Sequence, residues 1–279
     1  MITIIMSFKN ICKIRKRLII FFYKYFCKFY QKITTIYENL FMKKHNANFS
    51  FAKKGFFIMP FEKRNYLNFI TKSKIFLAND YLNVTIPDPD QIKLLIGNIF
   101  TKEVRDNITK LTGFNFSIDF LIIYERKFIP NDFRDVDTLN QAYSYKWHFD
   151  KPNSSNMLKI FIPINITNRH GPLQLIDKKR SKRIKGFENI NQINNKINLE
   201  GNSDKIFGFN PTLCAHRDGI PDKNFTATQI MFQLNPHSKW VVNSRLYNDK
   251  YKMRNQFGIW TNEPKFPFFA YFFDKRLDF

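Results

Sequence analysis

The sequence is poor in the residues that mark several classes of protein. Of its 279 residues only 9 are Gly and 12 are Pro, which excludes a collagen-like chain and a Pro-rich linker. The three Cys are an odd number without the spacing of a metal motif, so they indicate a reducing compartment rather than a disulfide scaffold. No run of about 18 uncharged apolar residues occurs, and a membrane-spanning helix is not expected. Without a phosphate-binding Gly loop, a GxSxG turn or a CxxC pair, nucleotide-dependent transfer, hydride transfer, serine hydrolysis and thioredoxin chemistry lose support.

Acidic residues are also scarce, and the net charge is therefore strongly positive. The chain has 45 Lys and Arg against 23 Asp and Glu, a formal charge of +22. Such a charge favours anionic partners such as nucleic acid, phospholipid headgroups or phosphorylated substrates. The abundance of Lys, Asn, Ile and Phe is equally typical of a compositional bias that requires no partner. No nucleic-acid reading motif accompanies the charge, so the sequence does not favour nucleic acid.

Residues 1–45 form a basic segment with the pattern of an amphipathic helix. Glu38 is the only acid in it, and residues 9–33 separate a basic side from an aromatic side at the helical period. Such a helix can attach reversibly to an anionic membrane, or it can pack its apolar side on the body of the protein. Lysines interrupt the apolar stretch and no small-residue cleavage site follows, so a signal peptide is not favoured. The basic side carries Lys9, Lys13, Arg17, Lys24 and Lys28, and the apolar side carries Ile14, Leu18, Phe21, Phe22, Tyr25, Phe26 and Phe29.

Residues 46–279 are interpreted as one domain in which a predicted helical part is followed by predicted strands. Asp88-Pro89-Asp90 predicts a helix start with Asp90 as the N-cap, and the helical lead-in covers about residues 90–113, ending near Gly113. Short strands separated by turn residues follow, which indicates a jelly roll or barrel over about residues 110–240. The strands are expected at 116–126, 142–150, 157–166, 173–176, 205–209 and 228–234.

Two further segments of this domain are irregular in sequence. Residues 177–204 are rich in Lys and Asn and are expected to form a surface loop. The tail from His237 to Phe279 is aromatic, and it is expected either to pack back on the β-core or to form a dimer contact. The predicted fold class is mainly β with flanking helices (α+β).

The segment Trp147-His148-Phe149-Asp150 carries the most informative pattern for chemistry. On a strand, residues i and i+2 point to the same face, so the imidazole of His148 and the carboxylate of Asp150 would project together. His216 follows after several predicted strands and is a candidate third ligand. Two His and one carboxylate with open coordination positions form the site of non-haem Fe(II) oxygenases. The sequence therefore predicts that these three side chains converge on one metal.

Four segments together carry a likeness to a known family. They read W-H-F-D at 147–150, L-K-I-F-I-P-I-N at 158–165, G-P-L-Q-L-I at 171–176 and G-F-N-P-T-L-C-A-H-R-D-G-I-P at 208–221. Within about residues 116–236, the chain resembles the phytanoyl-CoA dioxygenase-like branch of the Fe(II)- and 2-oxoglutarate-dependent oxygenases. The resemblance implies a double-stranded β-helix (jelly roll) core. It also implies Fe(2+) as cofactor, 2-oxoglutarate as cosubstrate, and His148, Asp150 and His216 as metal ligands.

One departure from the family's pattern concerns the cosubstrate. The family usually places an Arg about 11 residues after the second His, where it forks onto the 2-oxoglutarate carboxylate. Here residues 225–229 contain no base. Lys159 and Arg217 are candidates to replace it, with Thr228 and Gln229 adding hydrogen bonds. Alternatively, Lys159 is an edge-strand residue with its amine in solvent, and Arg217 is a surface charge paired with Asp218.

The resemblance implies an enzyme, a non-haem iron 2-oxoglutarate-dependent dioxygenase (hydroxylase). Its substrate would be a small molecule or a lipid- or saccharide-linked compound, and the basic charge favours an anionic one. Two alternatives remain open: a catalytically inactive jelly-roll binding protein, and a basic module that binds the membrane surface. The expected location is cytoplasmic, and peripheral to the inner face of the membrane if the N-terminal helix binds lipid.

Overall fold

The structure is a computed structural model that describes residues 29–62, 74–79, 81–134, 144–150, 154–182, 195–247 and 275–279. Most of the predicted helix at 9–33 lies outside these ranges, as do the phenylalanines between 266 and 273. Residues 29–41 are helical. None of the helices among the described residues is long and apolar enough to span a bilayer.

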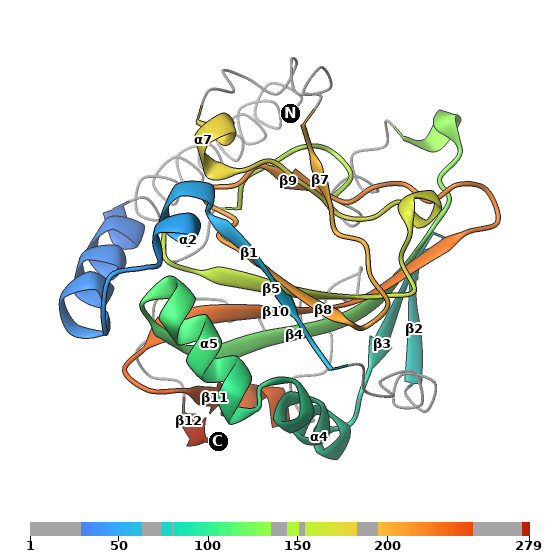
Figure 1. The fold of residues 1–279 in the computed structure, drawn as a ribbon. Coiled ribbons are helices and arrows are strands. Elements are labelled where there is room, and N and C mark those ends of the chain that lie inside the picture. Colours follow the sequence, from blue (N-terminus) through green and yellow to red (C-terminus); the bar gives the residue numbers. More distant parts are fainter. Residues whose placement is uncertain are drawn as a thin grey trace, which may run out of the picture.

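A large mixed sheet forms the centre of the molecule (Figure 1). Its strand order is β1-β8-β5-β10-β4-β11-β12, with β3 joined to β4 and β2 joined to β3. The bounds are β1 Phe56–Pro60, β2 Lys74–Asn79, β3 Leu82–Ile86, β4 Asn115–Lys127, β5 Leu158–Ile164, β8 Lys205–Phe209, β10 Thr226–His237, β11 Val241–Asn243 and β12 Arg276–Asp278.

A second, small sheet faces one side of the large sheet, as expected for a double-stranded β-helix. Its order is β7-β6-β9, with β7 Ile197–Asn198, β6 Gln174–Leu175 and β9 His216–Arg217. Figure 1 shows these strands above β5, β8 and β10, on the side away from α4 and α5. A buried cluster that includes Phe161, Leu173 and Met231 joins the two sheets. The predicted jelly-roll core and the mainly β, α+β class are confirmed.

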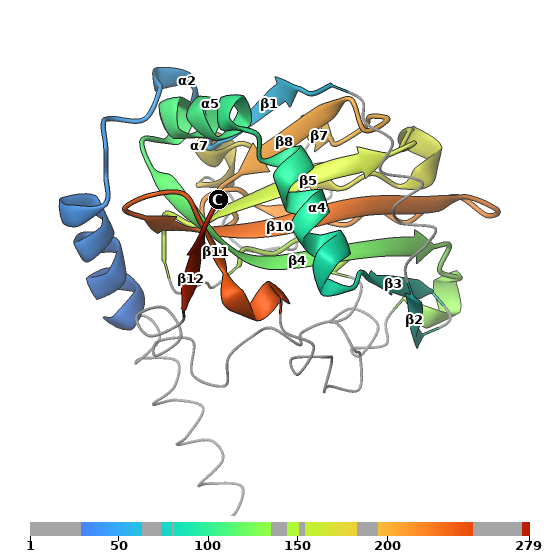
Figure 2. The same ribbon diagram turned by 90° about the horizontal axis from the view of Figure 1, so that it is seen from below.

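Helices cover the other side of the large sheet (Figure 2). α4 buries Ile92, Leu95, Ile96 and Ile99 in a second core cluster shared with β4, β5 and β10. Successive side chains of a strand point to opposite faces, so each central strand contributes to both clusters. For example, Phe232 of β10 lies in the helix-side cluster, and Met231 lies between the sheets. The helical elements are α2 Phe49–Lys54, α4 Pro89–Ile99, α5 Lys102–Thr112, α7 Lys178–Ser181, and the 3-10 turns Asn131–Phe133, Asn168–His170 and Ser244–Tyr247.

The helical lead-in is two helices rather than one. The N-cap is Asp88 and not the predicted Asp90, because Pro89 already occupies the first turn of the helix. Asp88 forms a capping box, in which the Gln91 backbone N–H donates to its carboxylate at 2.8 Å. A break follows at Phe100, whose side chain is buried in the core. The Thr101 hydroxyl then accepts a hydrogen bond from the Val104 N–H and caps α5. α5 ends at Gly113, which adopts φ 86°.

Two strand predictions and one loop prediction differ from the structure. Residues 144–150 form no strand and contribute only a single bridge at His148, because this segment crosses to the small sheet instead of joining the large one. β10 is longer than predicted, and residues 177–204 include α7 and β7. At the C-terminal end, β12 pairs antiparallel with β11, so these last residues pack back on the large sheet.

Candidate metal centre and its cavity

Backbone pairing brings the three predicted ligands together. His148 and His216 form an isolated antiparallel bridge, and each N–H donates to the other's carbonyl oxygen at 3.0 Å. Two residues further along, the Asp150 N–H donates to the Pro211 carbonyl oxygen at 3.0 Å. β9 is held from its other side by β6, where Leu175 is the register partner of His216. The candidate site therefore lies on paired backbone and not on an isolated loop.

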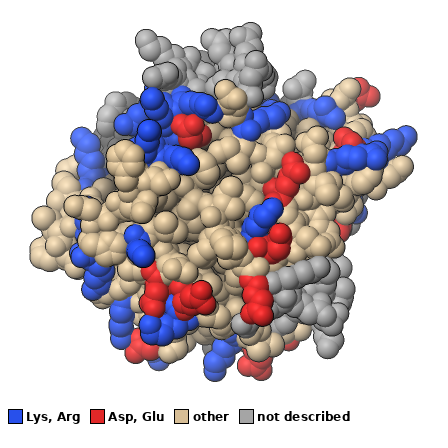
Figure 3. Space-filling view, in the orientation of Figure 1, with Lys and Arg blue, Asp and Glu red and all other residues tan. Residues whose placement is uncertain are grey.

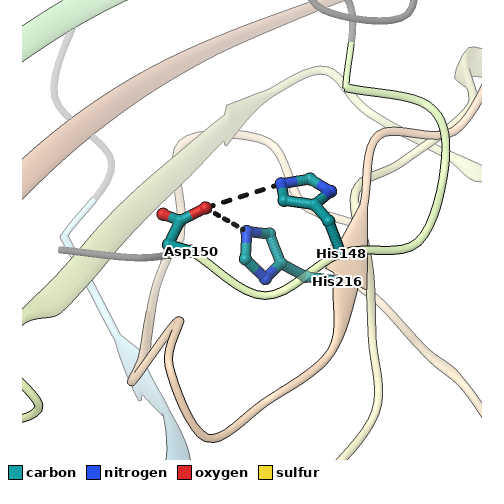
Figure 4. A group of neighbouring side chains, drawn as sticks. All are labelled: His148, Asp150 and His216. Atoms are coloured by element: carbon teal, nitrogen blue, oxygen red, sulfur yellow. Dashed lines mark ion pairs between the residues drawn. The ribbon is translucent and has the colours of Figure 1, made fainter. Parts of the chain in front are cut away.

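The three side chains point toward one another (Figure 4). The Oδ1 atom of Asp150 lies 3.5 Å from Nε2 of His148 and 3.5 Å from Nε2 of His216. All three potential ligand atoms lie within 4.8 Å of one another. Two metal–ligand bonds of about 2.1 Å at angles near 100° would place their ligand atoms about 3.2 Å apart. The spacing fits a small divalent ion bound between the three atoms.

Hydrogen bonds orient both imidazole rings for this role. Nδ1 of His148 lies 2.9 Å from the Lys146 carbonyl oxygen, and Nδ1 of His216 lies 3.1 Å from the Cys214 carbonyl oxygen. A carbonyl oxygen only accepts, so each Nδ1 carries the proton and each Nε2 presents its lone pair. Nε2 of His216 is buried and has no hydrogen-bond partner among the described residues. A metal ion would satisfy that atom.

The protonation states also fit a cation. Burial, followed by the neighbouring His216, lowers the pKa of His148 to about 4. Burial by itself would raise the pKa of Asp150, but Lys159 and His216 together hold it well below its usual range. At neutral pH His148 is therefore neutral and Asp150 is ionised, which are the forms that bind a divalent metal.

Lys159 of β5 positions the carboxylate. Its Nζ lies 2.5 Å from Oδ2 of Asp150, the oxygen that faces away from the two imidazoles. Oδ1 is then the oxygen left to bind a metal, so Asp150 would bind through one oxygen and leave more of the coordination sphere open. Lys159 also lines the cavity beside the site, where the sequence predicted a cosubstrate-binding residue. That role stays a prediction, and the alternative of an amine in solvent does not fit its 13% exposed side chain.

A cavity opens beside the two imidazoles. Its walls combine apolar side chains from the facing sheets with a few polar groups, which suits a small ligand that is partly polar. The lining residues are Leu82, Ile122, Tyr124, Ser144, His148, Lys159, Phe161, Leu173, His216, Asp218 and Met231.

Arg217 lies apart from this cavity. Strand alternation directs it to the face opposite His216. Its Nε donates to the Gln174 side-chain oxygen at 2.8 Å, and its guanidinium lies 4.8 Å from the ring centre of Trp147. Arg217 is not among the residues that line the cavity, so its predicted cosubstrate role gains no support from the geometry.

Thr228 and Gln229 point to opposite sides of β10. Gln229 is buried between the sheets and donates through Nε2 to the Tyr124 hydroxyl, whereas Thr228 faces the other side. Tyr124 lines the cavity, and its pKa is raised well above the usual range by burial and by Asp218. Gln229 therefore lies one residue behind the cavity wall.

The sequence reasoning missed Arg126, a fully buried arginine on β4. Its register partner on β10 is Ala227, at the position about 11 residues after His216 where the resemblance leads one to expect an Arg. Nη1 of Arg126 donates to the Gly219 carbonyl oxygen at 2.7 Å and lies 3.3 Å from Oδ1 of Asp218. A charged residue on the same strand face as Tyr124 and Ile122 was a visible signal. Its cross-strand partner was not, because register is a tertiary property.

Comparisons with solved structures found, among others, three chains of limited similarity to this one. The non-heme alpha ketoglutarate dependent epimerase SnoN from nogalamycin biosynthesis superposes with a TM-score of 0.45 at 10% identity, covering 67% of this chain and 79% of that chain. HygX from Streptomyces hygroscopicus, with nickel and 2-oxoglutarate bound, has a TM-score of 0.45 at 10% identity, and the match covers 67% of this chain and 85% of that chain. EctD from S. alaskensis, with 2-oxoglutarate and 5-hydroxyectoine, has a TM-score of 0.49 at 13% identity, and the match covers 78% of this chain and 80% of that chain. No family model matches the sequence, and no curated protein matches it. The function of this chain is therefore inferred from its own side chains.

Proposed function

We propose that the protein is a non-haem iron, 2-oxoglutarate-dependent dioxygenase of the phytanoyl-CoA dioxygenase-like branch, acting as a hydroxylase. The observation that carries the proposal is the convergence of two lone-pair-bearing imidazole nitrogens and one carboxylate oxygen beside a cavity. Two His and one carboxylate are typical of Fe(II) oxygenases, because they leave coordination positions for a cosubstrate and O2.

In this reaction the residues of the chain would bind the metal, orient its carboxylate ligand and exclude water. His148, Asp150 and His216 would hold Fe(2+), which with 2-oxoglutarate supplies an oxidant strong enough to hydroxylate an unactivated C–H bond. Lys159 holds the second oxygen of Asp150 and keeps the carboxylate in its one-oxygen orientation. Phe161, Met231 and the other apolar lining residues keep water away from the reacting carbon.

The substrate proposed is a small molecule or a lipid- or saccharide-linked compound with an anionic group. The support for an anionic group is the net charge of +22. Succinate formation from 2-oxoglutarate by the purified Fe(II)-loaded protein tests the reaction class. We expect succinate from the wild type and none from Asp150→Ala. A wild type that binds metal and forms no succinate would contradict the proposal and favour the inactive binding protein.

A second proposed activity is reversible attachment to an anionic membrane surface, and helix 29–41 carries it. The helix is docked by polar side chains: Tyr30, Thr34 and Glu38 are buried. The Glu38 carboxylate accepts hydrogen bonds from the Ser154 hydroxyl and from Asn156 Nδ2, the latter at 2.9 Å. The one acid of residues 1–45 therefore faces the protein.

The outward side of this helix is largely apolar. Phe29, Ile33, Ile36, Leu40 and Phe41 are exposed, with Leu40 at 71%. In Figure 3 the left edge, where this helix lies in Figure 1, shows tan and blue atoms and no red ones. An apolar side without acids, preceded by a basic segment, fits the interface of an anionic leaflet, where each nearby Lys or Arg contributes about 1 kcal/mol. This would place a cytoplasmic protein at the inner face of a membrane.

Flotation with lipid vesicles tests this attachment. We expect the full chain to float with vesicles containing phosphatidylserine at low salt, and less so at high salt or with phosphatidylcholine alone. The double variant Ile36→Asp, Leu40→Asp should lose flotation. Leu94→Asp, at an equally exposed apolar residue of α4, is the matched control and should float as the wild type does. A wild type that stays unbound at low salt would contradict the membrane proposal.

A further inference from the structure

The chain contains a second His-x-Asp segment, His216-Arg217-Asp218, which runs antiparallel to the first. The backbone N–H of Asp218 donates to the Ser144 carbonyl oxygen at 3.0 Å, just as Asp150 is held to Pro211 at the other end of the paired segments. Asp218 and His216 are two residues apart, and both line the cavity. The cavity therefore has a carboxylate, that of Asp218, which is not one of the three candidate metal ligands.

Three donors surround the Asp218 carboxylate. Arg126 Nη1 and Gln229 Nε2 lie 3.3 and 3.4 Å from Oδ1, and the Tyr124 hydroxyl lies 3.4 Å from Oδ2. A guanidinium, an amide and a hydroxyl arranged around one carboxylate form a recognition site for a carboxylate. Their distances are longer than those of tight hydrogen bonds, so the contacts hold Asp218 loosely.

The guanidinium of Arg126 is fixed independently of Asp218. Its side chain is fully buried, and its shortest hydrogen bond runs to the Gly219 carbonyl oxygen at 2.7 Å, while Nη2 donates to Oε1 of Gln229 at 3.3 Å. Arg126 contacts the cavity-lining Asp218 without lining the cavity itself, whereas Lys159 lines the cavity and is paired with Asp150 at 2.5 Å. Of the two, Arg126 is the one whose carboxylate partner is not a candidate metal ligand.

We propose that Asp218 is a built-in competitor at the carboxylate-binding subsite of the cavity, and that a dicarboxylic 2-oxo acid binds fully only by displacing it from Arg126, Tyr124 and Gln229. The inference deepens the proposed function and rests on it, since the 2-oxo acid end of the ligand would bind at the metal. Arg126 thereby takes the place of the arginine missing at Ala227, from the neighbouring strand.

This arrangement predicts an unusual selectivity among 2-oxo acids. The distal carboxylate of 2-oxoglutarate competes with Asp218 for one set of donors, and two carboxylates at one subsite repel each other. 2-Oxobutyrate lacks the distal carboxylate and does not compete. A charge-assisted contact of the distal carboxylate normally strengthens the binding of 2-oxoglutarate. Competition from Asp218 reduces this gain in binding free energy.

Calorimetric titration of the Ni(II)-loaded full-length protein tests the proposal without turnover. For the wild type we expect the affinities for 2-oxoglutarate and 2-oxobutyrate to agree within about tenfold, since the distal carboxylate gains little net free energy. A wild-type preference for 2-oxoglutarate of about a thousandfold would overturn the proposal, because the subsite would then be open to the ligand. This comparison of the two 2-oxo acids uses the wild-type protein alone.

Asp218→Asn and the smaller Asp218→Ser remove the competing charge. Each should raise the affinity for 2-oxoglutarate about tenfold or more, and leave the affinity for 2-oxobutyrate unchanged. Asp222→Asn is the matched control, because Asp222 pairs with Arg169 at 3.3 Å on the exposed surface; it should change neither affinity. Unchanged or weaker 2-oxoglutarate binding in folded Asp218 variants would overturn the proposal.

Failure of the proposed function would look different. If the metal site itself is wrong, the wild type will bind neither Ni(II) nor any 2-oxo acid. If only the role of Asp218 is wrong, Ni(II) and 2-oxoglutarate will bind, and the Asp218 variants will leave the ratio between the two 2-oxo acids unchanged.

Discussion

His148 and His216 are direct cross-strand partners, joined by two backbone hydrogen bonds of 3.0 Å, and their ring centres lie 4.3 Å apart. This one pairing sets the distance between the two imidazoles without any help from a metal. It also places the residue two positions after each histidine at opposite ends of the pair. One of these residues, Asp150, completes the candidate metal site, and the other, Asp218, meets Arg126.

Removal of the carboxylate ligand should abolish metal binding. In Asp150→Ala the two imidazoles remain, but the anionic ligand that offsets the charge of a divalent ion is lost. We expect no stoichiometric binding of Fe(II), Co(II) or Ni(II) in calorimetric titration. Asp222→Ala removes a half-exposed surface carboxylate and should bind metal as the wild type does. Tight stoichiometric metal binding by Asp150→Ala would place the metal site elsewhere.

Removal of the lysine that holds Asp150 should weaken metal binding without abolishing it. In Lys159→Met the Oδ2 atom loses its 2.5 Å partner, and the carboxylate becomes free to rotate. Loss of a group that orients a metal ligand typically costs about 10–100-fold in affinity, and we expect a change of that size for Co(II). Lys159→Arg should recover part of it. Lys205→Met on the adjacent strand β8 serves as the control, since its amine is half exposed and lies 4.0 Å from Asp204.

The stability of the metal-free protein should depend on pH through His148. Its pKa is about 4 in the folded chain and about 6.5 when unfolded, mainly because of burial. Between these values the unfolded chain binds more protons, so the contribution of His148 is complete above pH 6.5 and is lost as the pH falls toward 4. Urea unfolding with a chelator present, at several pH values in this window, measures it. His148→Gln should show a smaller loss of unfolding free energy over the same window, and an identical pH dependence would contradict the assignment.

The docking of helix 29–41 should depend on Glu38. Glu38→Ala leaves the Ser154 hydroxyl and Asn156 amide without their buried acceptor, which costs about 1–3 kcal/mol. We expect faster backbone hydrogen exchange in residues 29–41 and little change in β4 and β10. The exposed neighbour variant Lys32→Ala should exchange as the wild type does. Equal protection of the helix in the two variants would show that Glu38 does not hold it.

Local patterns in the sequence were sufficient for much of the architecture, and they singled out the three side chains that converge at the candidate metal site. The sequence located the helical lead-in to within two residues, from Asp90 (observed N-cap Asp88) to Gly113, because capping and a left-handed backbone are properties of a few adjacent residues. The strand content after Gly113 follows from β-branched and aromatic runs, and His148, Asp150 and His216 are rare residue types in a recognisable spacing. The predicted strand at 142–150 was wrong over the described residues 144–150, because the same alternation occurs in a segment that is held by only one bridge.

Only the tertiary structure determined which charged side chains meet at and behind the cavity wall. Arg126 meets Asp218 and lies opposite Ala227 because the pairing of β4 with β10 sets their register, and register depends on hydrogen bonds between segments far apart in the chain. The orientation of helix 29–41 was equally beyond the sequence. The amphipathic pattern was predicted for residues 9–33, of which only 29–33 are described, and it did not reach Glu38. The contacts of Glu38 with Ser154 and Asn156 turn that side of helix 29–41 inward. Periodicity shows that a helix has two sides, and only the partner surface selects which side is buried.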